Sequence, residues 1–171
     1  MSDLDRVNPE EYKDLPKRPV VLVLDNLRSL HNVGSAFRTA DAFCLEKIYL
    51  CGVTGTPPHR EIQKTALGAT ETVAWEHVAS TEELIKKLKS DGYSICSLEQ
   101  VEGSTMLNDF TPDAKNKYAF VFGNEVNGVL EEVIELSDYC LEIPQFGTKH
   151  SLNVSVTVGM VVWHYFLTLS S

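Results

Sequence analysis

The sequence predicts an α/β protein whose strands form a parallel sheet. Short aliphatic and β-branched runs alternate along the chain with segments of helical periodicity, and this alternation is typical of parallel sheets flanked by helices. The first run, residues 20–24, is apolar throughout, as expected for a strand that is covered on both faces. A length of 171 residues fits one domain, and a hydrophobic content of 43% is ordinary for a globular protein.

The N-terminal segment differs in composition from the rest of the chain. Residues 1–19 are polar and contain three prolines, so we expect either a disordered tail or an extended arm that lies on a partner subunit. Residues 20–171 are assigned to the domain itself.

The remaining elements are predicted from local patterns. Strands are expected at residues 47–52, 72–75, 93–98, 118–122 and 139–143. Helices are expected at residues 32–43, 62–67, 81–89, 129–136 and from 151 onward, with a loop at 101–117. Ser80 precedes Glu83 by three residues, which marks a helix N-terminus, and Pro144 ends the last strand because it has no N–H for a sheet ladder.

Three segments combine glycine with polar side chains: NVGSAFRTA at 32–40, FGNEVNGV at 122–129 and IPQFGTKHSLNVSV at 143–156. The last of them joins a strand end to a helix start, where backbone N–H groups converge on a ligand. In this order, the three segments resemble the motifs of the SpoU (TrmH-type) family of SPOUT methyltransferases. The resemblance covers about residues 20–169.

This resemblance implies a fold, an assembly and an activity. The fold is the SPOUT (α/β knot) fold, a parallel sheet with a trefoil knot near the C-terminus. The assembly is a homodimer with active sites at the subunit interface. The activity is methyl transfer from S-adenosylmethionine to a ribose 2′-hydroxyl in tRNA or rRNA. In the last helix, four residues are expected to belong to a dimer face, to the core or to both: Val158, Val161, Val162 and Tyr165.

The resemblance also implies roles for single residues. Arg38 matches the arginine assigned to the acceptor hydroxyl, and the groups that orient it match Asn32, Glu125, Ser151 and Asn153. The S-adenosylmethionine site is expected around eight residues: Leu98, Phe122, Gly123, Asn124, Ile143, Ser151, Leu152 and Asn153. A guanidinium stays protonated in proteins, so Arg38 is better suited to bind a phosphate and stabilise an alkoxide than to act as a base, unless a neighbouring phosphate takes the proton.

The pattern around Arg38 agrees with a role at the surface. Arg38 lies off the apolar stripe of its helix, four residues after Gly34, whose missing side chain we expect to let a nucleotide approach. The segment 56–71, TPPHREIQKTALGATE, also resembles the substrate-side loop of the family, and its alternative interpretation is a plain surface connection. Substrate binding is assigned to Arg28, Arg38 and Arg60.

Net charge is the property that weighs against an RNA substrate. The formal charge is −9, whereas nucleic-acid-binding proteins are usually basic. Residues 1–60 carry eight charges of each sign, but residues 121–171 carry one basic residue, Lys149, against six acidic ones. A phosphate-facing surface is therefore expected in the first third, from Lys17, Arg18, Arg28, Arg38 and Arg60.

Two other functions are compatible with the sequence. One is a non-catalytic RNA-binding protein of the same fold, and the other is a methyltransferase that acts on a substrate other than RNA. A Rossmann-type oxidoreductase is disfavoured because no G-x-G-x-x-G follows an expected strand.

Cysteine usage and the terminal segments bear on the compartment. The four cysteines are scattered without a C-x-x-C pair, which favours free thiols over a zinc site. The N-terminus lacks the apolar core of a signal peptide, and the longest apolar stretch, 154–169, is shorter than a membrane span needs. We therefore expect a cytoplasmic protein without a metal and without a membrane partner.

Overall fold

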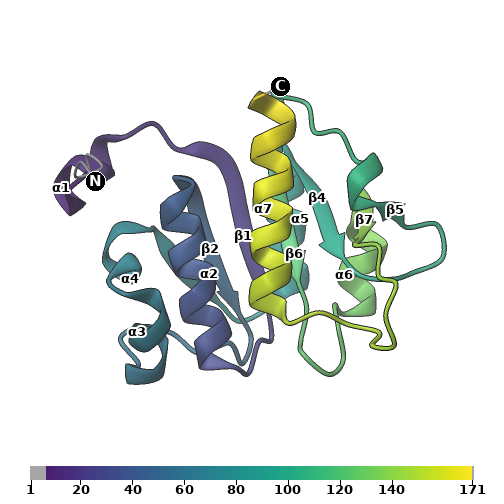
Figure 1. The fold of residues 1–171 in the computed structure, drawn as a ribbon, viewed down its shortest axis with the longest axis horizontal. Coiled ribbons are helices and arrows are strands. Elements are labelled where there is room, and N and C mark those ends of the chain that lie inside the picture. Colours follow the sequence, from purple (N-terminus) through teal and green to yellow (C-terminus); the bar gives the residue numbers. More distant parts are fainter. Residues whose placement is uncertain (1–6, 171) are drawn as a thin grey trace.

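The computed structural model describes residues 7–170, which form one parallel sheet flanked by helices (Figure 1). The sheet order is β3-β2-β1-β6-β4-β7-β5, and every pairing is parallel. The predicted fold class is thereby confirmed. The strands are β1 (Arg18–Asp25), β2 (Leu45–Cys51), β3 (Trp75–Val78), β4 (Tyr93–Leu98), β5 (Thr105–Met106), β6 (Lys117–Phe122) and β7 (Tyr139–Glu142). The helices are α1 (Pro9–Asp14), α2 (Leu30–Ala42), α3 (Arg60–Ala66), α4 (Ala69–Thr72), α5 (Thr81–Ser90), η1 (Leu107–Asp109), α6 (Glu131–Leu136) and α7 (Val154–Ser170).

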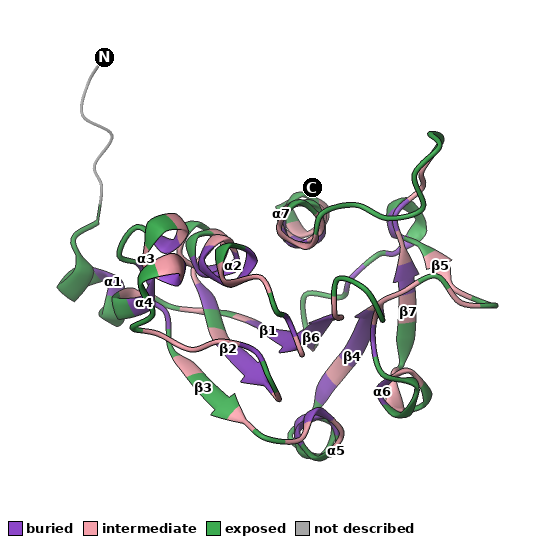
Figure 2. Cartoon of the chain, turned by 90° about the horizontal axis from the view of Figure 1, so that it is seen from below, coloured by how far each residue is buried: buried purple, intermediate pink, exposed green. Residues whose placement is uncertain are grey.

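Helices cover both faces of the sheet (Figure 2). One face carries α2, α3, α4 and α7, and the other carries α5 and α6. In β1, Leu22 and Leu24 point into the first layer, while Val21 and Val23 point into the second. All four are at most 1% exposed, which explains why this strand is apolar at every position from 20 to 24.

The helices α2 and α3 pack so closely that Gly34 has no room for a side chain. A Cβ atom at Gly34 would lie 2.1 Å from the Thr65 hydroxyl oxygen and 2.2 Å from the Ile62 carbonyl oxygen. The space that the glycine leaves is therefore filled by α3. Our expectation that it admits a nucleotide beside Arg38 is wrong.

Helix α7 has a buried side and an exposed side. The four residues that we assigned to a dimer face or to the core are at most 3% exposed and belong to the core: Val158, Val161, Val162 and Tyr165. The opposite side carries large apolar residues that are 41–51% exposed, which we call the α7 stripe: Val156, Met160, Trp163 and Leu167. Their spacing places them on one face of the helix.

Two predicted elements differ from the structure. The residues 72–75 were expected to form a strand, but Thr72 ends α4 and β3 begins only at Trp75. The left-handed backbone of Leu67 and Gly68, with φ of 50° and 92°, ends α3 and turns the chain into the extra helix. In the loop expected at 101–117, the structure has the two-residue strand β5 and the turn η1.

The N-terminal segment is not extended between residues 9 and 14, where it forms α1. Asn8 and Glu11 make a capping box that starts this helix, and Tyr12 is only 6% exposed. Residues 1–6 of the predicted arm lie outside the described part. The division into arm and domain stays a prediction, although β1 already begins at Arg18. Within residues 7–170, the structure contains no helix that is long and apolar enough to span a membrane.

Candidate active site

Three neighbouring strands end level with one another at the carboxyl edge of the sheet. Phe122 of β6 pairs with Leu98 of β4, and Leu98 pairs with Leu141 of β7. In open α/β sheets, ligands bind beyond the carboxyl ends of the strands. The loops that follow these three strands surround one cleft, which we call the main cleft.

The main cleft has a volume of about 470 Å³, which suits a small-molecule ligand. All eight residues predicted for the S-adenosylmethionine site line it: Leu98, Phe122, Gly123, Asn124, Ile143, Ser151, Leu152 and Asn153. Asn32 and Glu125, predicted to orient the acceptor group, line it as well. The structure thus brings together residues from three distant segments.

The loop after β6 is folded back tightly on itself. Asn124 and Gly128 exchange two backbone hydrogen bonds of 2.9 Å. A Cβ atom at Gly123 would lie 2.2 Å from both the Gly128 carbonyl carbon and the Val129 nitrogen. Only glycine fits there, and the backbone of this loop stands directly at the edge of the main cleft.

Glu125 ties this loop to the start of α2. Its Oε2 accepts a hydrogen bond from the Arg28 backbone N–H at 3.1 Å, and its Oε1 accepts one from Ser29 N–H at 3.1 Å and one from Asn32 Nδ2 at 3.4 Å. Burial raises the pKa of Glu125, but these donors, together with its own N–H, outweigh burial and hold the pKa below the usual 4.5. An ionised Glu125 therefore positions Asn32 beside the main cleft.

Asn153 shapes the other wall by starting α7. Its Oδ1 accepts hydrogen bonds from the backbone N–H and the hydroxyl of Ser155, and its carbonyl oxygen accepts one from Thr157 N–H at 3.0 Å. The loop residues Ser151 and Leu152 precede this cap directly. Their backbone is thereby held at the mouth of the cleft.

The family model described as "SpoU rRNA Methylase family" matches residues 19–163, most of the chain that forms the sheet and the cleft. The chain belongs to the SpoU rRNA methylase family. Among curated relatives of this SpoU chain, the 23S rRNA (guanosine-2′-O-)-methyltransferase RlmB of Neisseria meningitidis is 33% identical over 150 residues. The aligned part is 88% of this chain and 59% of the relative, so the chain spans about three fifths of that protein's length.

Solved structures of related proteins have the same fold. The AdoMet-bound rRNA methyltransferase from Sinorhizobium meliloti matches with a TM-score of 0.82 and 25% identity, over 97% of this chain and 62% of that one. The A. aeolicus TrmH/SpoU tRNA modifying enzyme matches with a TM-score of 0.83 and 23% identity, over 95% and 82% of the two chains. Because its identity is only 23%, the similarity to the A. aeolicus protein shows the fold alone.

The three predicted substrate-binding arginines of the SpoU chain do not line the main cleft. Arg38 is exposed on the outer side of α2 and lines a second cavity of about 460 Å³. Arg28 and Arg60 are exposed too, and Arg28 contributes only its backbone N–H to Glu125. Arg38 therefore does not face the cofactor residues of its own chain, and its role in an active site at a subunit interface stays a prediction. We call the second cavity the Arg38 hollow; it is lined by Ser35, Arg38, Thr39, Ala42, Phe43, Lys64, Thr65 and Gly159.

Two carboxylates also line the main cleft: Glu99, which the family resemblance places with Leu98 at one wall of the cofactor pocket, and Glu142, which was missed in the sequence. Glu99 follows β4, and its Oε2 accepts a hydrogen bond from Val129 N–H at 2.9 Å. Glu142 ends β7 and accepts hydrogen bonds of 2.7 Å from Gln100 and Ser104. The signal that could have found Glu142 is its position, since it is the acidic residue at the carboxyl end of β7. Among the residues that the structure describes, no group of three His, Cys, Asp or Glu side chains is placed to hold a metal ion.

The hydrogen bonds of Glu125 predict a pH-dependent contribution to stability. Because the folded pKa lies below the unfolded value of 4.5, this contribution is full above about pH 4.5 and is lost as the pH falls through the folded pKa. Glu125→Gln removes the titrating group. We expect the free energy of unfolding of the wild type to fall more steeply than that of the variant below pH 5, measured by urea denaturation.

A matched control for this experiment is Glu132→Gln, which changes an exposed glutamate of α6. This variant should keep the steeper pH dependence of the wild type. If Glu125→Gln also keeps it, the carboxylate is not held by these donors in solution.

Proposed function

We propose that the chain is an S-adenosylmethionine-dependent RNA methyltransferase that modifies a ribose 2′-hydroxyl in tRNA or rRNA. The observation that carries this proposal is the main cleft of a SpoU-family chain, where three distant motifs meet at the carboxyl edge of the sheet. The relatives named above as rRNA methyltransferases support an RNA substrate. A substrate of this kind favours a cytoplasmic location.

The main cleft fits S-adenosylmethionine in size and in chemistry. Its volume of about 470 Å³ suits a ligand of that size, and Leu98, Ile143 and Leu152 offer apolar surface for an adenine ring. The glycine-rich loop brings backbone groups to its edge, and Glu99 and Glu142 add negative charge. When bound, the cofactor supplies an activated methyl group on a positively charged sulfur.

The protein's own residues then position the acceptor. Asn32 is held beside the main cleft by Glu125, where its amide can orient a ribose hydroxyl. Arg38 supplies a permanent positive charge that binds a backbone phosphate and stabilises the oxygen as it loses its proton. If the phosphate takes that proton, it acts as the base. If it does not, Arg38 contributes only electrostatic stabilisation of the oxygen.

A homodimer reconciles the separate positions of Arg38 and the main cleft. We infer that the α7 stripe is the contact face, because large apolar residues in a row are otherwise rarely left in water. Phe43, which lines the Arg38 hollow, packs on Trp163 of this stripe with ring centroids 6.2 Å apart. Such a contact would put the Arg38 hollow of each subunit next to its partner and allow an active site built from both.

The trefoil knot stays a prediction that rests on the family resemblance. The course of the chain is compatible with it, since β7 lies between β4 and β5 in the sheet although it follows both in sequence. His164 of α7 also contacts the Phe110 carbonyl oxygen at 2.7 Å, so the last helix lies against the segment between β4 and β6.

The proposed function is tested by incubating the purified protein with methyl-labelled S-adenosylmethionine and bulk bacterial RNA. We expect label in RNA and, after nuclease digestion, in 2′-O-methylnucleosides identified by mass spectrometry. Comparing the 2′-O-methyl sites in RNA from cells with and without the gene then identifies the nucleotide. Label in protein instead would favour the second candidate, a non-RNA substrate, which the net charge of −9 permits. Cofactor binding without any transfer would favour a non-catalytic RNA-binding protein.

A further inference from the structure

The Arg38 hollow contains hydrogen-bond donors that the folded chain does not use. Within residues 7–170, the Arg38 guanidinium has no ion pair or hydrogen bond, and the hydroxyls of Ser35 and Thr39 have none either. The three residues share one face of α2, because they are three or four positions apart. They form a set of free donors around one cavity.

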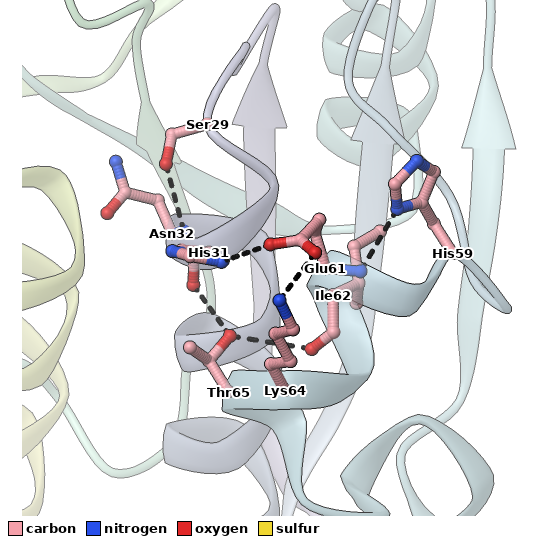
Figure 3. A network of polar contacts seen from close by, with 8 residues as sticks. All are labelled: Ser29, His31, Asn32, His59, Glu61, Ile62, Lys64 and Thr65. Carbon is pink, nitrogen blue, oxygen red and sulfur yellow. Dashed lines mark hydrogen bonds and ion pairs between the residues drawn. The ribbon is translucent and has the colours of Figure 1, made fainter.

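Lys64 adds a second cation to the Arg38 hollow, from α3. Figure 3 shows how it is held: Lys64 Nζ lies 2.7 Å from Glu61 Oε1, and Glu61 Oε2 lies 2.7 Å from His31 Nε2 on α2. Thr65 donates a hydrogen bond of 2.9 Å to the His31 carbonyl oxygen and fastens the same two helices. An ammonium group has three donors, so two of those on Lys64 remain after the contact with Glu61.

The charge of the Arg38 hollow is opposite to that of the main cleft. No Asp or Glu is among the described residues that line the hollow, whereas Glu99, Glu125 and Glu142 line the main cleft. Across from the cations, a Cβ atom at Gly159 of α7 would meet nothing within 4 Å, so the cavity is open on that side. Arginine, lysine and hydroxyl donors around an open cavity without carboxylates are the groups that bind phosphate.

We propose that Lys64 is a positioning residue for the RNA backbone phosphate that the proposed function assigns to Arg38, and that the two cations hold this phosphate in the Arg38 hollow. The inference rests on the proposed function, because the phosphate is taken to belong to the RNA substrate. Glu61 and His31 act through Lys64, since they fix where its ammonium points. Arg60 lies four residues before Lys64 on the same face of α3 and extends the basic surface away from the hollow.

The test compares Lys64→Gln, Lys64→Arg and the matched control Lys86→Gln in the chain of residues 1–171. Lys86 is similar to Lys64 in exposure, 58% against 51%, and it pairs with Glu82 at 2.6 Å, but it lies on α5 across the sheet. RNA affinity is measured by fluorescence anisotropy with labelled bulk tRNA at several salt concentrations, and S-adenosylmethionine affinity by calorimetry.

We expect Lys64→Gln to weaken RNA binding about three- to tenfold and to reduce the slope of log K against log salt by about 0.7 to 0.9, the loss of one phosphate contact. Lys64→Arg should keep most of the affinity and the slope, because the charge is kept. Lys86→Gln should behave like the wild type, and no variant should change S-adenosylmethionine affinity.

Two contrary results have different meanings. If the wild type binds and methylates RNA but Lys64→Gln is indistinguishable from Lys86→Gln, the phosphate site is wrong and the proposed function stands. If the wild type binds no RNA at any salt concentration while it binds S-adenosylmethionine, the RNA substrate is wrong and the phosphate site falls with it.

Discussion

Arg38→Ala is expected to reduce methyl transfer by at least about a hundredfold, the effect of removing a donor that stabilises a developing oxyanion. S-adenosylmethionine affinity should stay nearly unchanged, because Arg38 lines the Arg38 hollow and not the main cleft. Stability should stay unchanged too, since the side chain is exposed. Single-turnover transfer of labelled methyl to RNA, calorimetric titration with S-adenosylmethionine and thermal melting measure the three quantities.

Two controls separate a specific role from the loss of any surface charge. Arg28→Ala removes an exposed arginine whose backbone, not its side chain, binds Glu125, and it should cost far less activity. Arg38→Lys keeps the charge but loses the planar fork, so an intermediate rate would identify the geometry of the guanidinium as the important property. Near-normal turnover of Arg38→Ala would contradict its assignment.

The variant Arg38→Ala also tests whether one active site uses residues of both subunits, when it is combined with a second variant. Leu152→Arg places a positive charge in the main cleft and should block cofactor binding without unfolding the chain, since Leu152 is 38% exposed. A mixed dimer of Arg38→Ala with Leu152→Arg contains one intact site only if Arg38 works on the partner's cleft. We then expect about half of the wild-type turnover per dimer. No recovery in a purified mixed dimer would mean that each subunit works alone.

Gly123→Ala is expected to weaken the binding of S-adenosylmethionine strongly. The added Cβ atom would lie 2.2 Å from backbone atoms of Gly128 and Val129, and backbone cannot rotate away as a side chain can. The loop after β6 must therefore shift by an ångström or more, which disturbs the edge of the main cleft. We expect calorimetry to show a loss of cofactor affinity of about tenfold or more. Urea denaturation should show that the free energy of unfolding falls by about 1–3 kcal/mol.

The matched control for this change is Gly159→Ala in α7. A Cβ atom there meets nothing within 4 Å, and alanine favours helix by about 1 kcal/mol over glycine. This variant should be as stable as the wild type or more stable, with unchanged cofactor affinity. Equal affinity in Gly123→Ala would show that the loop is mobile enough to accept a side chain.

The sequence predicted the central strands well because their signal is local. The strands β1 and β6 contain continuous apolar runs, at 20–24 and 118–122, and β4 is apolar apart from Ser94 and Ser97. Burial on both faces is therefore visible in composition alone. The strand β5 was missed because two residues carry no periodicity. The start of β3 was predicted too early because the left-handed backbone of Leu67 leads into the extra helix α4. A left-handed backbone is rare for leucine, so the sequence does not predict it.

The candidate site was predictable only in part. The residues of the main cleft belong to motifs at strand ends, and the carboxyl edge of a parallel sheet brings such ends together. The distance between Arg38 and the main cleft was not predictable. Helical spacing places Arg38 on the same face as Gly34, but it does not say where that face lies relative to the sheet. The use of Gly34 for contact with α3 likewise depends on tertiary packing.

The strand order has a consequence for how the molecule is made. The ladder between β1 and β6 joins Leu24 to Phe122, nearly a hundred residues apart, and divides the sheet into an early half and a late half. A nascent chain that has left the ribosome through β3 already carries Arg38 and Lys64, but none of the strands that end at the main cleft. The main cleft, the proposed site of the methyl donor, exists only once β7 has emerged and docked, so affinity for the donor would report a chain that is made and folded through β7.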